Sequence, residues 1–415
     1  MPNSGRNGRF SRARRPNDHL GVTVVAPGGH NPLRYNMKVL HLFSNTKWTG
    51  PAEPVVNLCA TLQQRGIETI LACSPGPHRS DSSVARQARA KALRVSTDLA
   101  LTKHLLLRHA LADILRLKRF IETERVNLIH AHLENDHLIG AIAARLATNR
   151  PVVLRTSYHG DGLPLTLRTR LLLRAYTDGL IVCSKKARSH DMESFSFPED
   201  RLWTVYGAVD TDRFNPERPA PDLRRRFRLS DDLFVVGVVA RIQRRRKFDV
   251  LLDALARASA DAPTLRAMIV GRGTRMREVV VEPALRLRVD GRVVLPGYLG
   301  GDDYVGALKA LDAIVFLVPG TDGTCRALLE AMAIGKPAIV ANVGVLPEVV
   351  RDGVEGIVVP HDPRQLASAI VRLLRDRDLR RQMGSNAHAR VVARFSLHPQ
   401  AQAVELIYRT LLPKQ

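Results

Sequence analysis

Short apolar runs alternate with stretches of helical periodicity along most of the chain, and this alternation is what most constrains the fold. Between the runs, the helical spacing is clearest at 51–65, 104–124 and 137–147. Strands that alternate with helices predict a parallel sheet covered by helices on both faces. The apolar runs of the first half lie at 38–44, 67–73, 126–131, 151–156, 179–184 and 201–207.

The alternation stops at 208–233, which is rich in proline and charge, and then starts again. The second set of apolar runs lies at 234–240, 266–271, 292–297, 313–318, 337–341 and 356–360, with helices following at about 363–376, 378–394 and 399–411. A chain of 415 residues is too long for one ordinary core.

We therefore predict an α/β protein with two Rossmann-like domains, 37–207 and 234–390, facing each other across a cleft. Residues 208–233 would be the linker, and 391–415 a C-terminal helix that packs back toward the N-terminal domain. Ligands of such sheets bind beyond the carboxyl ends of the strands, so the cleft is the expected site.

The first 36 residues are basic and polar, and we expect a disordered arm there. Met37 opens a clean strand, so an upstream misreading of the start is an alternative. No apolar run approaches the ~20 residues that span a bilayer. No uninterrupted apolar segment follows the basic N-terminus, so a secretory signal peptide is not expected. The four cysteines (Cys59, Cys73, Cys183, Cys325) are scattered, without the CxxC spacing of a zinc site or the pattern of a disulfide-bonded domain. This favours location in the reducing cytoplasm.

The net charge of +23 indicates an anionic partner: nucleic acid, a membrane surface or a charged small molecule. Basic residues cluster at 116–120, 167–174 and 241–247. No helix-turn-helix, zinc-finger or aromatic RNA-binding motif accompanies them, so we expect no nucleic acid.

The stretch GTDGTCRALLEAMAIGKP, residues 320–337, places Asp322 and Glu330 eight residues apart around a helix start. The helix is expected over 324–334, directly after the strand at 313–318, so its N-terminus points into the cleft and favours an anion such as phosphate. The alternative is a capped helix, with Asp322 near the N-cap and an Arg326–Glu330 pair contributing a few tenths of a kcal/mol.

This stretch resembles the signature of retaining glycosyltransferases of the GT-B fold, family 4, in which two acids eight apart precede Ala-Met-Ala and Gly-x-Pro. The resemblance runs in family order from about 38 to 411. It implies two Rossmann-like domains, and transfer of a sugar from a nucleotide-diphosphate sugar with retention of configuration. The other matching segments are 48–66, 201–216, 239–255 and 346–363.

The resemblance assigns the donor nucleotide to the C-terminal domain. Glu330 takes the place of the acid that holds the ribose, since a carboxylate accepts two hydroxyl hydrogen bonds. Asp322 takes the place of the acid that reaches the donor sugar, where most members have glutamate, so the identity of the sugar stays open. The backbone of Gly323, Thr324 and Cys325 would then touch the sugar or the phosphates.

Cations are needed at the diphosphate, because the leaving group accumulates negative charge. Arg241 matches the family's arginine, and Arg246 or Lys247 stands where the family has lysine; the alignment leaves both open, as it does a solvated basic loop. With two protein cations available we expect no divalent metal and no other cofactor. Asp302 and Asp303 would form a helix cap.

On the N-terminal side, His159 and Gly160 resemble the family's His-Gly, which approaches the reacting centre from the other domain. A histidine there can hydrogen-bond a sugar hydroxyl or the acceptor, although it could also only cap a loop. Gly50 opens the first strand–helix turn, where the lack of Cβ would let backbone approach phosphate, and Glu53 would orient that turn. Packing explains His130 and His132 as well as function does.

The resemblance thus implies a donor-dependent transferase acting on a saccharide or lipid-linked acceptor, with lipopolysaccharide core or exopolysaccharide assembly as the leading expectation. The rivals are a nucleotide-sugar epimerase or phosphorylase of the same fold, and a non-catalytic basic protein that binds nucleic acid or membrane.

Two leucine- and arginine-rich segments, 104–124 and 165–174, either pack on the sheet with solvated basic faces or lie on an anionic membrane. The second alternative predicts a cytoplasmic protein held peripherally at the inner face of the membrane. In the first segment the predicted stripe is Leu105, Leu106, Ala110, Ile114 and Leu117, flanked by Lys103, Arg108, Arg116, Lys118 and Arg119.

Overall fold

The computed structural model describes residues 37–48, 50–75, 83–102, 104, 106–320 and 323–412. The chain divides into two compact units at residue 35, and everything below concerns the second unit. The arm expected over 1–36 lies outside the described residues.

The N-terminal half forms a seven-stranded parallel sheet in the order β3-β2-β1-β4-β5-β6-β7. Its strands are β1 Lys38–Phe43, β2 Glu68–Cys73, β3 Arg94–Ser96, β4 Leu128–Ala131, β5 Val152–Ser157, β6 Gly179–Val182 and β7 Leu202–Thr204. The helices that connect them are α1 Ala52–Gln64, α2 Ser83–Ala90, α3 Leu107–Glu124, α4 Glu134–Leu146, α5 Leu167–Tyr176 and α6 Lys185–Phe195. The edge strand β3 was not expected from the sequence, because its three residues are too few to show an apolar run.

The second half forms a six-stranded parallel sheet in the order β10-β9-β8-β11-β12-β13. Its strands are β8 Phe234–Val239, β9 Leu265–Val270, β10 Val293–Gly297, β11 Ala313–Phe316, β12 Ala338–Ala341 and β13 Gly356–Val359. The helices around it are α8 Phe248–Ala258, α9 Glu282–Arg286, α10 Gly301–Ala310, α11 Arg326–Ala333, α12 Leu346–Val349, α13 Pro363–Arg375 and α14 Arg377–Arg394. In both sheets the strand order reverses beside the first strand, as in Rossmann domains, so the predicted fold class is confirmed.

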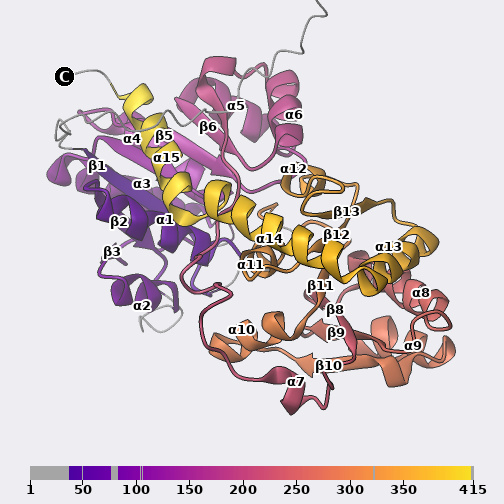
Figure 1. Cartoon of the computed structure of the whole chain (residues 1–415). Helices are drawn as coiled ribbons and strands as arrows, with labels where there is room; N and C mark the ends of the chain where they lie inside the picture. The colour runs from indigo at the N-terminus through magenta and orange to yellow at the C-terminus, as the bar shows by residue number, and fades with distance from the viewer. Residues whose placement is uncertain are drawn as a thin grey trace, which may run out of the picture. The chain divides into compact units, whose positions relative to one another are not determined.

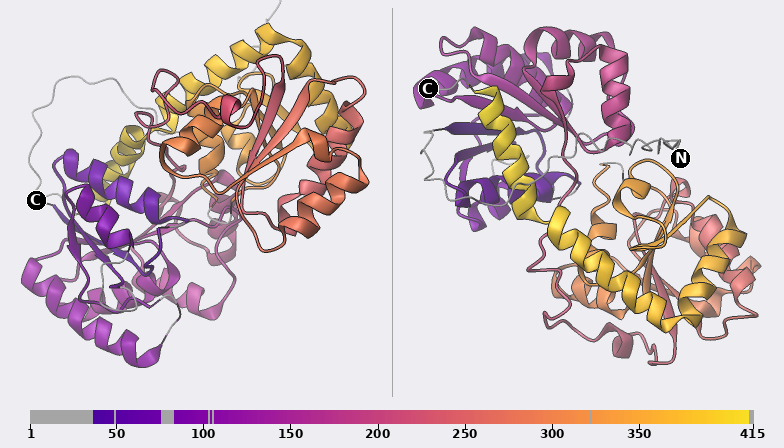
Figure 2. Two further views of the ribbon diagram at one scale, coloured as in Figure 1. Left: turned by 90° about the horizontal axis from the view of Figure 1, so that it is seen from below. Right: turned by 45° about the horizontal axis from the view of Figure 1, so that its top comes forward.

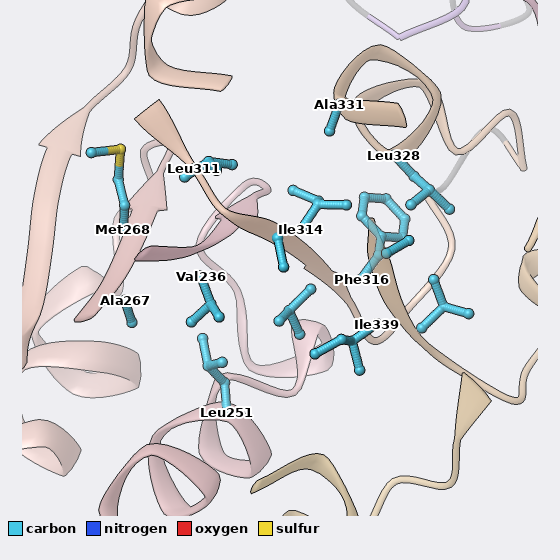
Figure 3. Packing of buried hydrophobic residues seen from close by; sticks show 14 of the residues in the cluster. Val236, Leu251, Ala267, Met268, Leu311, Ile314, Phe316, Leu328, Ala331 and Ile339 are labelled. Atoms are coloured by element: carbon cyan, nitrogen blue, oxygen red, sulfur yellow. The ribbon is translucent and has the colours of Figure 1, made fainter. Parts of the chain in front are cut away.

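Apolar strands buried on both faces explain why the strands read as continuous hydrophobic runs. In the C-terminal core, Val236, Ile314 and Ile339 come from neighbouring strands (Figure 3). Leu251 of α8 and Leu328 of α11 are part of the same core and cover the sheet from its two flanking helices.

The stretch expected as a linker is largely part of the C-terminal body. Phe214, Leu223 and Leu229 are buried in the C-terminal core, and the short helix α7, Leu223–Arg226, packs against α10. The change in composition at 208 therefore marks a segment that buried apolar residues, Val209 among them, attach to the C-terminal core.

The last described helix packs on the N-terminal domain. Helix α14 packs its buried face on the C-terminal core, and α15, Leu397–Leu411, then packs against α1 of the N-terminal domain (Figure 1). Figure 2 shows the same return path of the two yellow helices from other sides. Where the chain crosses back, the N–H of Val209 donates to the carbonyl of Phe395 at 2.8 Å, so both crossings run side by side.

Helix α3 decides between the two alternatives for most of its predicted stripe. Ala110, Ile114 and Leu117 are buried in the N-terminal core and pack on the sheet, whereas Leu106 of the same stripe is 50% exposed. Lys103 and Leu105 lie outside the described residues. Among the helices that the structure describes, none is both long and apolar enough to cross a bilayer.

Candidate active site

The loop between β11 and α11 supplies the C-terminal side of the candidate site. Gly323 has φ +56° and Cys325 has φ +49°, both in the left-handed region, so the helix begins at Arg326 and not at 324 as expected. Thr324 and Cys325 are buried, and Asp322 lies outside the described residues.

Glu330, in the second turn of α11, is a buried carboxylate with defined partners. Its side chain is 3% exposed, accepts a hydrogen bond from the Tyr304 hydroxyl at 2.5 Å, and lies 3.4 Å from Nε of Arg326. Burial raises the pKa of Glu330, while Arg326 and the Tyr304 hydroxyl act in the opposite direction. The site therefore holds a desolvated acceptor whose charge is partly balanced by one arginine.

Arg326 also reaches the other domain. Its guanidinium donates to Glu53 of α1 at 2.6 Å, and Glu53 accepts a second bond from Arg213 at 3.2 Å. The sequence indicated the Arg326–Glu330 pair but not Glu53 as the nearer partner, because no spacing rule connects positions 273 residues apart. Glu53 thus joins the first turn of the N-terminal domain to the mouth of α11.

The loop after β5 meets the 323–325 segment directly. A Cβ added to Gly323 would lie 2.9 Å from the Gly160 N and the Tyr158 O, and 2.6 Å from Sγ of Cys183. Gly207 has the same relation to Thr324, whose carbonyl would lie 2.8 Å from a Cβ there. These backbones approach so closely that only glycine fits, so the structure brings the His159-Gly160 loop and the 323–325 segment together.

His159 is exposed beside this contact, with Nε2 3.7 Å from a carboxylate oxygen of Glu134. Partial burial and the nearby charge of Arg155 lower the pKa of His159, and Glu134 opposes this shift. Its imidazole is consequently neutral at neutral pH and is able both to donate and to accept a hydrogen bond.

The predicted cations lie at the carboxyl ends of β8 and β11. Arg241 follows β8 and is exposed, whereas Arg246 donates to the carbonyls of Val318 and Pro319 at 3.4 and 3.1 Å. Lys247 has φ +59° and lines, with Arg246, a small pocket between β8 and β11. Arg246 is therefore tied to the segment that follows β11, and Lys247 is the N-cap residue immediately before α8.

Gly50 has φ +57°, and a Cβ there would meet no atom within 4 Å. The backbone conformation, and not crowding, is what favours glycine at this turn. The helix cap expected of Asp302 and Asp303 is wrong: the N-cap of α10 is Gly300, and both acids lie in the first turn, where they pair with Arg218 and Arg226.

A second polar cluster lies at the middle of the N-terminal sheet, on β1, β4 and the residue after β4: His41, His130 and His132, all buried, with ligand atoms within 4.8 Å of one another. Their ring nitrogens already have partners: His41 Nδ1 bonds His132 Nε2 at 3.0 Å, and Tyr408 Oη bonds His130 Nδ1 at 2.7 Å. The remaining bonds are His130 Nε2 to Thr156 at 2.7 Å, His132 Nδ1 to Tyr158 at 2.9 Å, and His41 Nε2 to Tyr408 at 3.4 Å. All six ring nitrogens are thus in one hydrogen-bonded network, which explains these histidines by packing.

Comparison with known proteins identifies the family. The family described as "Glycosyl transferases group 1" matches residues 220–390, and "Glycosyltransferase Family 4" matches residues 48–213. A GDP-mannose-dependent alpha-(1-6)-phosphatidylinositol monomannoside mannosyltransferase of Mycobacterium tuberculosis is 30% identical over 68% of this chain and 75% of its own length.

The chain belongs to the family 4 glycosyltransferases.

Other relatives of this transferase agree. A D-inositol 3-phosphate glycosyltransferase of Saccharomonospora viridis is 29% identical over 72% of the chain and 73% of its own length. Among solved structures, a glycosyltransferase from Rickettsia africae has a TM-score of 0.78 at 16% identity, over 92% of this chain and all of its own. Anabaena HepE in complex with UDP and glucose has a TM-score of 0.72 at 20% identity, covering 90% of this chain and 99% of its own. The fold of the transferase is GT-B, and it is an enzyme of the glycosyltransferase class.

Proposed function

We propose that this transferase moves a sugar from a nucleotide-diphosphate sugar to a saccharide with retention of configuration. The observation that carries the proposal is Glu330, a buried carboxylate beside a backbone segment that touches the His159-Gly160 loop of the facing domain. The solved structure named as Anabaena HepE with UDP and glucose supports a nucleotide-sugar donor.

In this proposal each side of the cleft has a distinct role. Glu330 accepts the ribose hydroxyls, which join the Tyr304 hydroxyl on its carboxylate. Arg241, with Arg246 or Lys247, balances the growing charge of the diphosphate, so that no divalent metal is needed. Asp322 reaches the sugar hydroxyls, and the departing phosphate oxygen accepts the proton of the attacking hydroxyl on the same face of the sugar.

His159 is proposed to position the acceptor. Because its pKa is lowered, the neutral ring can accept from the incoming hydroxyl or donate to a sugar oxygen. His159 Nε2 lies 3.7 Å from a carboxylate oxygen of Glu134, so Glu134 can orient the ring without forming a short ion pair with it.

We further propose that the acceptor is a lipid-linked saccharide of the cell envelope, used at the inner face of the membrane. The relative named a phosphatidylinositol monomannoside mannosyltransferase supports a lipid-borne acceptor. A structure named lipopolysaccharide outer core galactosyltransferase WaaB, with a TM-score of 0.70 at 15% identity, shares the fold.

Thermal-shift measurements with UDP-, GDP- and ADP-sugars test the proposal, since a ligand that binds the folded state at about 100 times its Kd stabilises it by about 2.7 kcal/mol. We expect one donor class to raise the Tm of the wild type. Glu330→Ala should lose that shift, because a hydrogen bond to a charged group contributes about 1.5–3 kcal/mol. Glu282→Ala, which changes an exposed acid of the same domain, should keep it.

No shift with any nucleotide sugar, or equal shifts in the wild type and Glu330→Ala, would contradict the proposal. Conversion of the bound nucleotide sugar into another nucleotide sugar without any acceptor would show the rival epimerase instead.

A further inference from the structure

The outer face of α3 carries a row of exposed leucines. Leu107, Leu111 and Leu115 are 74%, 63% and 60% exposed and follow one another at intervals of one helical turn. The neighbouring face of the helix, with Ala110, Ile114 and Leu117, is buried in the N-terminal core. The helix is thus apolar on two faces, and the outer one contacts no other part of the described chain closely enough to be covered.

Helix α5 repeats this arrangement. Leu167 and Leu171, again one turn apart, are 86% and 61% exposed, and Leu165 just before the helix is also exposed. More than half of the large exposed hydrophobic residues in the described part of the chain lie on these two helices or in the residues just before them. An apolar surface of this kind on a soluble domain usually marks an interaction site.

Helix α4 contacts both α3 and α5, and hydrogen bonds join its start to the segment before α3 and to the first turn of α5. Asn135 of α4 donates to the carbonyl of Thr102 at 3.0 Å and accepts from Arg168 of α5 at 3.2 Å. Its neighbour Glu134 is the residue that lies 3.7 Å from His159. The exposed leucines at these helix starts therefore lie at the same edge of the sheet as the proposed acceptor side of the cleft.

The charge around the leucines is of one sign. Helix α5 contains no acidic residue. On α3, Asp113 is buried and accepts the backbone N–H groups of Ala100 and Leu101, while Glu122 and Glu124 lie at the far end and pair with basic residues. The exposed basic residues that flank the leucines are Arg108, Arg116, Arg119, Arg170 and Arg174.

We propose that these leucines and arginines form a docking face for an anionic bilayer surface. The leucine–arginine face consists of Leu107, Leu111, Leu115, Leu167 and Leu171 with the five arginines just named. The leucines enter the boundary between headgroups and acyl chains, and the guanidinium groups bind lipid phosphates. A second copy of the chain is the poorer partner, because it would set arginines against arginines. This inference deepens the proposed function and rests on it for its purpose, which is to bring a lipid-linked acceptor to His159.

Vesicle flotation of the full chain tests the face. The vesicles contain phosphatidylcholine alone, or phosphatidylcholine with about one third phosphatidylglycerol, at low ionic strength and at about 0.5 M NaCl. We expect binding to the anionic vesicles only, and release by the higher salt.

Two variants separate the contributions. The first variant removes the apolar row of α3 by the substitutions Leu107→Ser, Leu111→Ser and Leu115→Ser. The second reverses the charge of α3 by Arg108→Glu, Arg116→Glu and Arg119→Glu. Each should weaken vesicle binding about tenfold or more, since insertion and headgroup attraction act together. The matched controls change as many exposed residues elsewhere: Leu285→Ser, Leu287→Ser and Leu406→Ser, and Arg375→Glu, Arg377→Glu and Arg381→Glu.

Equal binding to neutral and anionic vesicles, no binding to either, or an equal loss in the control variants would overturn the proposal. So would a concentration-dependent dimer that the leucine variant abolishes while no vesicle binding is seen, because the face would then be a self-association surface. Donor-induced thermal shifts, measured on the same variants, should be unchanged. If vesicle binding holds and no donor shift is seen in any protein, the proposed function fails and the docking face stands.

Discussion

At the scale of single residues, the candidate site depends on charges that are only partly compensated. Glu330 is buried and shares Arg326 with Glu53 of the other domain, while Arg241 is exposed at the end of β8. The buried Glu330 carboxylate suits a ligand that donates hydroxyl hydrogen bonds, and the exposed Arg241 suits a ligand that develops negative charge.

Arg241→Ala should lower kcat more than it weakens donor binding, because the charge on the diphosphate grows toward the transition state. A loss of roughly 10–1000-fold in kcat is the expected range for one electrostatic contact. Steady-state kinetics together with donor Kd measurements check this, with Arg257→Ala as a surface control on α8. An unchanged kcat would remove Arg241 from the mechanism.

The histidine network predicts a dependence of stability on pH. Burial lowers the pKa of His41 to about 3, and it lowers those of His130 and His132 as well. An unfolded histidine titrates near 6.5, so below that pH the unfolded state binds protons that the folded state excludes, and stability falls as pH falls. One such histidine accounts for about 2 kcal/mol between pH 6.5 and 5.

His132→Gln should therefore be less stable than the wild type at pH 7 but lose less stability between pH 7 and 5. Urea denaturation at both pH values measures the two differences. Parallel losses in wild type and variant would mean that groups elsewhere, such as the buried His137, and not this network, cause the acid sensitivity.

How much of the site the sequence could predict depends on distance along the chain. Glu330 lies eight residues after position 322, and both follow an apolar strand. These are local features of the sequence, and they identified residues 320–337 as part of the site. The partners Tyr304 and Glu53 come from other elements, and only the folded chain shows that they meet Glu330 and Arg326. The same limit explains why the core-facing stripe of α3 was found and its exposed row was missed: both faces are apolar, and periodicity alone does not say which one is buried.

At the scale of elements, the contact between the loop after β5 and the loop before α11 decides whether the two halves of the site meet. Gly323 has little room there, since a Cβ would press on the Tyr158 and Gly160 backbone and on Cys183. The elements themselves were largely predictable, because twelve apolar runs correspond to strands, and β3 escaped for want of length.

Gly323→Ala should lower activity strongly, because it forces these loops apart. Gly301→Ala is the matched control: its φ is also +56°, but its Cβ would meet nothing within 4 Å. Both variants carry the strain of a left-handed alanine, of order 1–3 kcal/mol, so the difference between them isolates the contact. Equal activities and equal Tm values would show that the close approach has no role.

At the scale of the whole described unit, two carboxylates join the domains. Glu53 accepts from Arg326, and Glu348 of α12 accepts from the Lys185 and Lys186 N–H groups at the start of α6 and from the Tyr206 hydroxyl. The second contact puts a negative charge at a helix N-terminus, which is a favourable arrangement.

Glu348→Ala should favour separation of the domains, since three donors lose their acceptor. Small-angle scattering should show a larger radius of gyration without donor, and a smaller difference when a nucleotide sugar is present. Glu282→Ala, on the surface of one domain, should scatter like the wild type. Indistinguishable scattering of all three proteins would mean that Glu348 does not hold the domains together.

Glycosyl transfer should persist in EDTA, because Arg241 and either Arg246 or Lys247 are proposed to balance the negative charge of the diphosphate. Initial rates with and without chelator check this expectation. Loss of activity that Mg²⁺ or Mn²⁺ restores would show that the cations of the chain are not sufficient.

The paired crossings at Val209 and Phe395 have a mechanical consequence. A single peptide connection would let one body swivel in any direction about the other. Two adjacent connections that are hydrogen-bonded to each other restrict twisting. They leave essentially one relative motion of the domains, a rotation that opens them about the line that joins the two connections. Each cycle of entry and exit would then return Gly323 to the same place against the Tyr158 and Gly160 backbone, and cutting either connection alone would leave the bodies attached but free to twist.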